Sequence, residues 1–161
     1  MTLLNQQEGA DREKLAVIGN SRGSEIAQLL GQRRPSLVRD VVAYAPSAVV
    51  NGPFRGQGAA WTEHGHPIPT GPIPRDRVRG KVLAIGGGND KMWESEDATR
   101  VIKSQHQRGM VFPDAGHHVN WFPYGQPGQE GGQDGRIVAT ARADQQARAE
   151  SWPAVLRLLE R

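Results

Sequence analysis

A serine flanked by glycines is the first feature of this sequence that could carry chemistry. The apolar run 15–18 leads into Gly19-Asn20-Ser21-Arg22-Gly23, and residues 24–30 continue with helical spacing. A strand, a sharp turn and a helix form a nucleophile elbow, in which strained dihedral angles expose the serine hydroxyl. The helix N-terminus would stabilise an oxyanion, with the Arg22 backbone N–H as one donor. The alternative interpretation is an N-cap serine in a glycine-rich chain.

Two later loops supply an acid and a base. Asp90 follows a run of glycines that ends an apolar segment, and His117 follows Pro113-Asp114-Ala115-Gly116. The order Ser21, Asp90, His117 is that of the α/β-hydrolases and differs from the chymotrypsin and subtilisin orders. In such a triad His117 would accept the proton of Ser21, and Asp90 would orient the imidazole and stabilise its charged form.

Each of these assignments has a structural alternative. Asp90 on its own would more simply cap the helix that follows it. His118 competes with His117 for the role of base, and the Ala-Gly-His context favours His117. His64 and His66 have a spacing that could suit a metal, but no carboxylate or third histidine supports such a site. The sequence therefore predicts no metal and no cofactor.

Two tryptophans near the candidate triad have both a functional and a structural interpretation, and Glu25 has a structural one. Trp61 and Trp93 could line an apolar acyl pocket, and aromatic packing between loop and sheet is an equal alternative. Glu25 falls in the first turn of the helix after Ser21, where a carboxylate stabilises the helix dipole.

The elements that must position these residues alternate between strand and helix. Short apolar runs predict strands, and apolar residues at three- and four-residue spacing predict helices. The expected strands are 14–19, 40–45, 81–85 and 110–112, and the expected helices are 24–30, 94–106 and 139–160. In the last helix Trp152, Val155, Leu156 and Leu159 would face the sheet, and Pro153 could kink or restart it. The pattern predicts an α/β fold of about four mainly parallel strands with flanking helices.

Prolines and glycines interrupt this alternation. Residues 46–80 contain many of both and predict an irregular loop within the domain, and a second glycine-rich loop is expected over 125–135. Residues 1–13 read as a loop or a frayed helix end. The whole chain, 1–161, is expected to form one domain.

Composition limits the function further. The chain has 161 residues, 37% apolar and 23% charged, with no cysteine and a net charge of +3. The absence of cysteine excludes disulfides and thiolate nucleophiles and is compatible with a reducing cytoplasm. Arginines are scattered and no nucleic-acid motif accompanies them, so nucleic acid is not expected as a partner. No apolar run approaches the length of a membrane span, and we expect a soluble cytoplasmic protein without a membrane partner.

Several stretches together resemble a known family, the C-terminal catalytic domain shared by acyl-CoA thioester hydrolases and bile acid-CoA:amino acid N-acyltransferases. The stretches are Gly19–Glu25, Val42–Ser47, Ala60–Thr62, Gly87–Ser95 and Ala115–His117. By this resemblance Ser21 is the nucleophile, Asp90 the triad acid and His117 the base, and the substrates are acyl-CoA thioesters or related esters. Family members that transfer acyl groups to amino acids tend to use cysteine, so Ser21 favours hydrolysis over N-acyl transfer.

The sequence also departs from that family. Asn89 stands where the family often has a second Asp, and Glu94 stands where it often has Pro. In the resembled fold the nucleophile strand is the fifth of eight, whereas here about thirteen residues precede it, so the chain reads as the C-terminal half of an α/β-hydrolase. Two consequences are expected: loss of the second oxyanion donor, and an exposed edge on the nucleophile strand that invites self-association. A truncated, non-catalytic or partner-dependent fragment is therefore the alternative function.

Overall fold

A computed structural model describes residues 7–9, 11, 13, 15–105, 107–120 and 135–160, with the backbone alone over 135–140. Three helices and four longer strands make up the body of this part of the chain. The strands are β1 (Ala16–Asn20), β2 (Asp40–Tyr44), β7 (Val82–Gly87) and β8 (Arg108–Phe112), and the helices are α1 (Arg22–Arg33), α2 (Ser95–Ser104) and α3 (Gly135–Leu159).

The four longer strands form one parallel sheet in the order β1-β2-β7-β8. Each strand is joined in register to the next, with Asn20 opposite Tyr44, Tyr44 opposite Ile85 and Gly87 opposite Phe112. Because all four strands run the same way, the loops after them emerge at one edge of the sheet, which is where open α/β sheets place their ligands. The α/β class and the parallel sheet predicted from the sequence are confirmed.

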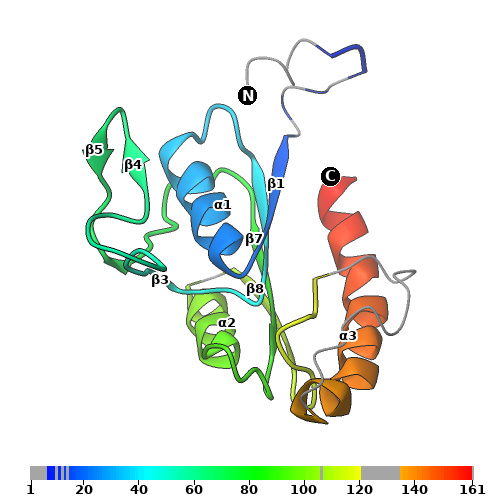
Figure 1. Cartoon of the computed structure of the whole chain (residues 1–161). Coiled ribbons are helices and arrows are strands. Elements are labelled where there is room, and N and C mark those ends of the chain that lie inside the picture. The colour runs from blue at the N-terminus through cyan, green and yellow to red at the C-terminus, as the bar shows by residue number, and fades with distance from the viewer. Residues whose placement is uncertain are drawn as a thin grey trace.

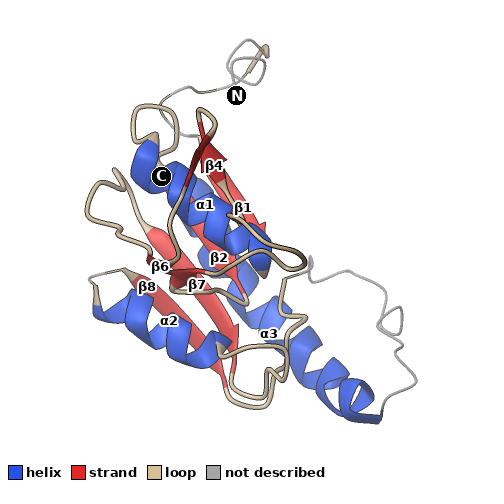
Figure 2. Ribbon diagram, turned by 60° about the vertical axis from the view of Figure 1, so that its left-hand side comes forward, coloured by secondary structure: helices blue, strands red, loops and turns tan. Residues whose placement is uncertain are grey.

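Helices cover both faces of the sheet (Figure 1). Helix α1 packs against β1 and β2, and α2 packs against β7 and β8. Helix α3 lies on the opposite face, against β2, β7 and β8, as the view in Figure 2 also shows. The alternation of side chains along each strand supplies both layers of core. Val41 and Val82 face α1 and α2, whereas Val42 and Leu83 face α3.

Strand β1 forms one edge of this sheet. Val17 packs into the core beneath α1, and the next side chain, Ile18, points to the opposite face and is 49% exposed. An apolar residue this exposed on an edge strand is a place where another strand could pair.

The buried faces of two helices differ in part from the prediction. In α1 Leu29 is buried and Ile26 and Leu30 pack against the core, as the helical spacing of residues 24–30 predicts, but the helix also buries Ser24, Glu25, Gln28 and Gln32, so polar groups make up much of its inner face. In α3 the residue that faces the sheet with Val155 is Leu158, which is fully buried, whereas Leu156 is 39% exposed.

The boundaries of other elements differ by a few residues. Strand β8 begins before the predicted residue 110, and α3 begins before 139 and continues through Pro153 as one helix. The predicted loop 125–135 lies outside the described residues up to 134. Among the described residues, no helix is both long and apolar enough to cross a membrane.

The segment 46–80, predicted to be an irregular loop, contains four two-residue strands: β3 (Val49–Val50), β4 (Thr62–Glu63), β5 (His66–Pro67) and β6 (Gly71–Pro72). They pair as β3 with β6 and β4 with β5, both antiparallel. Val50, Ile68 and Ile73 pack with Leu29 of α1 in a small core of their own. This segment is therefore anchored to the helix that begins at the serine turn.

Candidate active site

Ser21 occupies a strained turn between β1 and α1. Its dihedral angles are φ 54° and ψ −124°, a positive φ that costs a non-glycine residue on the order of 1–3 kcal/mol. The Ser21 N–H donates to the Tyr44 carbonyl at 3.0 Å, which fixes the turn against the end of β2. Arg22 is the first residue of α1, so its backbone N–H is one of the donors that a helix start leaves unpaired.

The two glycines of the elbow are not equivalent. A Cβ on Gly19 would lie 2.1 Å from the Gly23 carbonyl oxygen and 2.9 Å from the Ala27 Cβ, so this position admits no side chain. A Cβ on Gly23 would meet no atom within 4 Å. The backbone therefore approaches closely on the Gly19 side of Ser21, where α1 turns back across β1, and leaves free space on the Gly23 side.

Asp90 and His117 form a buried pair at the same edge of the sheet. His117 Nδ1 and Asp90 Oδ2 are 2.8 Å apart, and the two side chains are 7% and 1% exposed. Asp90 Oδ1 accepts the backbone N–H groups of Met92 and Trp93, at 2.9 and 3.3 Å. Burial raises the pKa of Asp90, but hydrogen bonds from His117 and Met92 and the charge of His117 outweigh it and hold that pKa below its ordinary value. Asp90 does not cap α2, because that helix begins at Ser95.

The loops that carry Asp90 and His117 are bound together through their backbones. The Gly88 N–H donates to the Phe112 carbonyl and the Asn89 N–H to the Ala115 carbonyl, both at 2.9 Å. This contact needs glycine at position 87, since a Cβ there would lie 2.1 Å from the Gly116 carbonyl oxygen. The glycine run before Asp90 thus lets the histidine loop approach the acid.

Trp93 connects this pair to the serine side of the site. Its indole N–H donates to the Ala45 carbonyl at 2.9 Å, and its ring meets the His117 ring edge-on, with centroids 5.7 Å apart. Ala45 directly follows Tyr44, which accepts the Ser21 N–H.

Within the described residues, Ser21 Oγ makes no hydrogen bond to His117. Such bonds are often long in unliganded enzymes and shorten when substrate binds.

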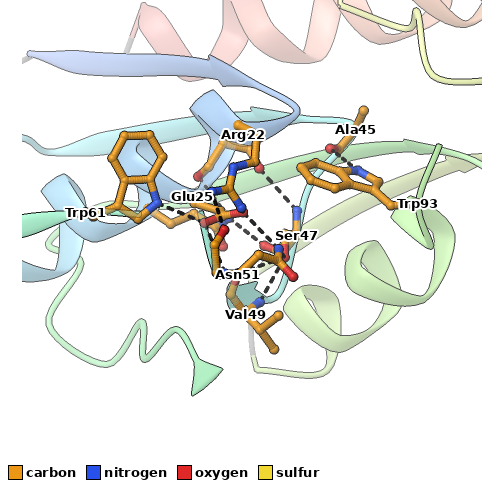
Figure 3. A network of polar contacts seen from close by, with 11 residues as sticks. Arg22, Glu25, Ala45, Ser47, Val49, Asn51, Trp61 and Trp93 are labelled. Carbon is orange, nitrogen blue, oxygen red and sulfur yellow. Dashed lines mark hydrogen bonds and ion pairs between the residues drawn. The ribbon is translucent and has the colours of Figure 1, made fainter. Parts of the chain in front are cut away.

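Glu25 lies at the centre of a buried polar network that the sequence did not reveal (Figure 3). Its carboxylate is fully buried and accepts hydrogen bonds from Asn51 (N and Nδ2), the Trp61 indole N–H at 2.9 Å and Arg22 at 3.2 Å. Arg22 also donates to the Gly52 carbonyl at 2.6 Å. Glu25 was expected to act on the helix dipole, whereas it ties α1 to the segment 46–80. Hydropathy offers no signal for it, because a glutamate in a first helical turn is normally exposed.

Trp61, His64 and His66, which were also singled out in the sequence, all lie in the segment 46–80. Trp61 packs beside Val50 and Ile68 and lies 5.9 Å from the Arg22 guanidinium. His64 Nε2 accepts a hydrogen bond from Arg34 at 3.1 Å, and His66 is exposed on β5. No group of three potential metal ligands occurs in the part of the chain that the structure describes.

The two elbow glycines give a matched pair of variants. Gly19→Ala should lower the free energy of unfolding by about 3 kcal/mol, because the new methyl group overlaps the Gly23 backbone. Gly23→Ala should leave stability unchanged or raise it by up to about 1 kcal/mol, since alanine favours the helix and has free space. Urea unfolding measures both. Equal destabilisation by the two substitutions would contradict the asymmetric contact.

The lowered pKa of Asp90 predicts how stability depends on pH. A carboxyl whose pKa is lower in the folded state stabilises the fold above its unfolded pKa, and this contribution is lost as pH falls through the folded value. The difference in unfolding free energy between wild type and Asp90→Asn should therefore be largest near neutral pH and shrink in acid. Urea titrations at a series of pH values test this. A difference that does not change with pH would show that Asp90 is not held ionised by His117.

Glu25→Gln should destabilise the protein by about 3 kcal/mol, because the amide has one acceptor oxygen and its NH₂ would face the donors Asn51 and Trp61. The fluorescence of Trp61 should also change as its hydrogen bond is lost. Glu96→Gln, which removes an exposed ion pair with Arg100, is the control and should have little effect. Equal effects of the two substitutions would mean that the Glu25 network does not hold α1 to the segment 46–80.

Comparison of the sequence with protein-family models and with curated proteins gave no match. The family resemblance of the motifs accordingly remains a prediction.

Proposed function

We propose that this protein is a serine hydrolase that cleaves acyl-CoA thioesters or related esters through an acyl-enzyme. The observation that carries the proposal is the buried His117–Asp90 pair, placed at the same sheet edge as a serine in a strained turn at a helix N-terminus. Burial of a histidine with a carboxylate is the arrangement that activates a hydroxyl nucleophile. The chain order of the three residues and the parallel sheet support an α/β-hydrolase type of fold.

In the proposed mechanism each group has its own role. With Nδ1–H donated to Asp90, His117 Nε2 carries a lone pair and accepts the Ser21 proton as Oγ attacks the thioester carbonyl. The oxyanion of the tetrahedral intermediate is stabilised by the Arg22 backbone N–H. Collapse of the intermediate breaks the C–S bond, and His117 returns the proton to the leaving thiol. Water, deprotonated by His117, then attacks the ester on Ser21 and releases the acid.

A groove beside Trp93 is suited to the acyl part of the substrate. It has a volume of about 280 Å³, and its apolar lining includes Val49, Trp93, Ala98 and Val101. Glu94 and Asp97 also line it. Two carboxylates disfavour phosphate groups at this place, so the anionic part of a CoA thioester would lie outside the groove. The contact of Trp93 with His117 sets this groove next to the proposed base.

A second candidate function, a partner-dependent hydrolase fragment, is favoured by one observation. Strand β1, which leads into Ser21, is an edge strand and exposes Ile18. Pairing of this edge with a second copy would cover Ile18 and fix the strand that carries the nucleophile.

A fluorophosphonate probe tests the first proposal. The wild-type protein should be labelled once, at Ser21, and Ser21→Ala should not be labelled. His117→Gln should label at least about a hundredfold more slowly, because the hydroxyl loses its base. Ser36→Ala, a serine between α1 and β2, is the control and should label like wild type. Equal labelling of wild type and Ser21→Ala would contradict the proposal.

Size-exclusion chromatography tests the second candidate function, the partner-dependent fragment. If the β1 edge pairs with a second copy, the protein should elute as a dimer, and Ile18→Lys should shift it to a monomer with reduced labelling. A monomeric wild type with full thioesterase activity would contradict partner dependence and leave the hydrolase proposal intact.

A further inference from the structure

Two buried charged residues of α3 form hydrogen bonds with the backbone on either side of His117. Asp144 Oδ1 accepts the backbone N–H of Gly116, and Arg148 Nε donates to the His118 carbonyl at 2.7 Å. Asp144 is 1% exposed and Arg148 is 5% exposed. One helix residue therefore holds the Ala115–Gly116 peptide group and the other holds the His118–Val119 peptide group, so the two bracket His117.

The two residues are four apart, so they project from the same face of the helix. Ala147, between them, is fully buried against the sheet core together with Val155 and Leu158. The helix is thus fixed to the sheet by apolar contacts on either side of the polar ones. Burying an acid and a guanidinium costs several kcal/mol each, and apolar residues would fill the same space without that cost. The polar groups therefore contribute position more than stability.

The His117 loop is also held before this point, because the Ala115 carbonyl accepts the Asn89 N–H, and Asp144 and Arg148 act on the residues that follow, Gly116 to His118. The His117 ring is bound to Asp90, and it meets Trp93 and His118 edge-on at 5.7 and 5.9 Å. These contacts restrict the ring but do not fix the backbone from which it extends. A rotation of the Gly116–His118 backbone would move Nδ1 away from Asp90.

We propose that Asp144 and Arg148 are positioning residues, which hold the backbone of His117 so that its ring stays hydrogen-bonded to Asp90. The catalytic consequence rests on the proposed hydrolase function, whereas the positioning itself does not. What is required of Asp144 is an acceptor oxygen for the Gly116 N–H. Burial raises the pKa of its carboxyl, and the Gly116 amide and the neighbouring His118 offset this only in part. A neutral amide should therefore serve in its place.

The test follows the His117–Asp90 hydrogen bond directly, by the downfield proton NMR signal of the His117 Nδ1–H, together with fluorophosphonate labelling. Asp144→Ala should lose or shift the signal and slow labelling roughly tenfold to a hundredfold, as expected when a reacting group is displaced. Asp144→Asn should keep both the NMR signal and the labelling rate, because its amide oxygen still accepts the Gly116 N–H. Arg148→Met should behave like Asp144→Ala. Gln146→Ala, on the exposed side of α3, is the control.

The outcomes separate this inference from the proposed function. Folded Asp144→Ala or Arg148→Met with an unchanged signal would overturn the inference, as would loss of the signal in Asp144→Asn. In the unmodified protein the Gly116 amide should exchange slowly with solvent, and exchange as fast as in an exposed loop would overturn it without any variant. A wild type that shows the His117 signal but is never labelled would contradict the hydrolase proposal and leave the positioning role standing.

Discussion

The hydrogen bond from the Ser21 N–H to the Tyr44 carbonyl is the interaction on which the site depends. It holds a serine at positive φ, a conformation that persists only where the surroundings over-determine it. The register of β1 with β2 supplies the acceptor, and the absence of a side chain at Gly19 lets α1 cross back over the strand. The hydroxyl is thereby placed at a helix start, at the edge where the other strands deliver Asp90 and His117.

A second constraint acts through the helix that follows the serine. Helix α1 buries Glu25 beneath the segment 46–80, and Arg22, Asn51 and Trp61 satisfy its carboxylate. Gln28 continues this polar face: it donates to the Ser47 carbonyl and accepts from Arg75, a buried guanidinium whose pKa burial lowers to about 10. The segment after β2 is therefore bound to α1 by polar groups as well as by apolar packing.

The sequence predicted the alternation of strands and helices well, because buried parallel strands are short apolar runs and each is ended by glycine or proline. The juxtaposition of Asp90 with His117 was also within its reach, since the carboxyl ends of parallel strands meet at one edge. What it could not predict is the polar inner face of α1. Hydropathy treats Glu25 and Gln28 as solvent-facing, and their burial depends on partners such as Asn51 and Arg75 that lie far along the chain.

The same limit explains why the sequence does not reveal the contacts of Asp144 and Arg148 with the histidine loop. Their positions on α3 fit either side of an amphipathic helix, and only the packing of that helix on β2, β7 and β8 reveals that they face the histidine loop. In the same helix Val155, Trp152 and Leu159 pack on the sheet core as their spacing predicts, whereas Leu158 is buried and Leu156 is exposed. Tertiary contacts decide which side is buried.

A serine hydrolase that acts through an acyl-enzyme must become acylated on Ser21 by its substrate. Rapid mixing of the protein with an acyl-CoA thioester, followed by acid quenching and peptide mass spectrometry, measures this directly. A peptide carrying one acyl group on Ser21 should be present at early times in wild type and absent in Ser21→Ala. Release of CoA at the same rate by wild type and Ser21→Ala, with no acylated Ser21 at any time, would contradict the acyl-enzyme mechanism.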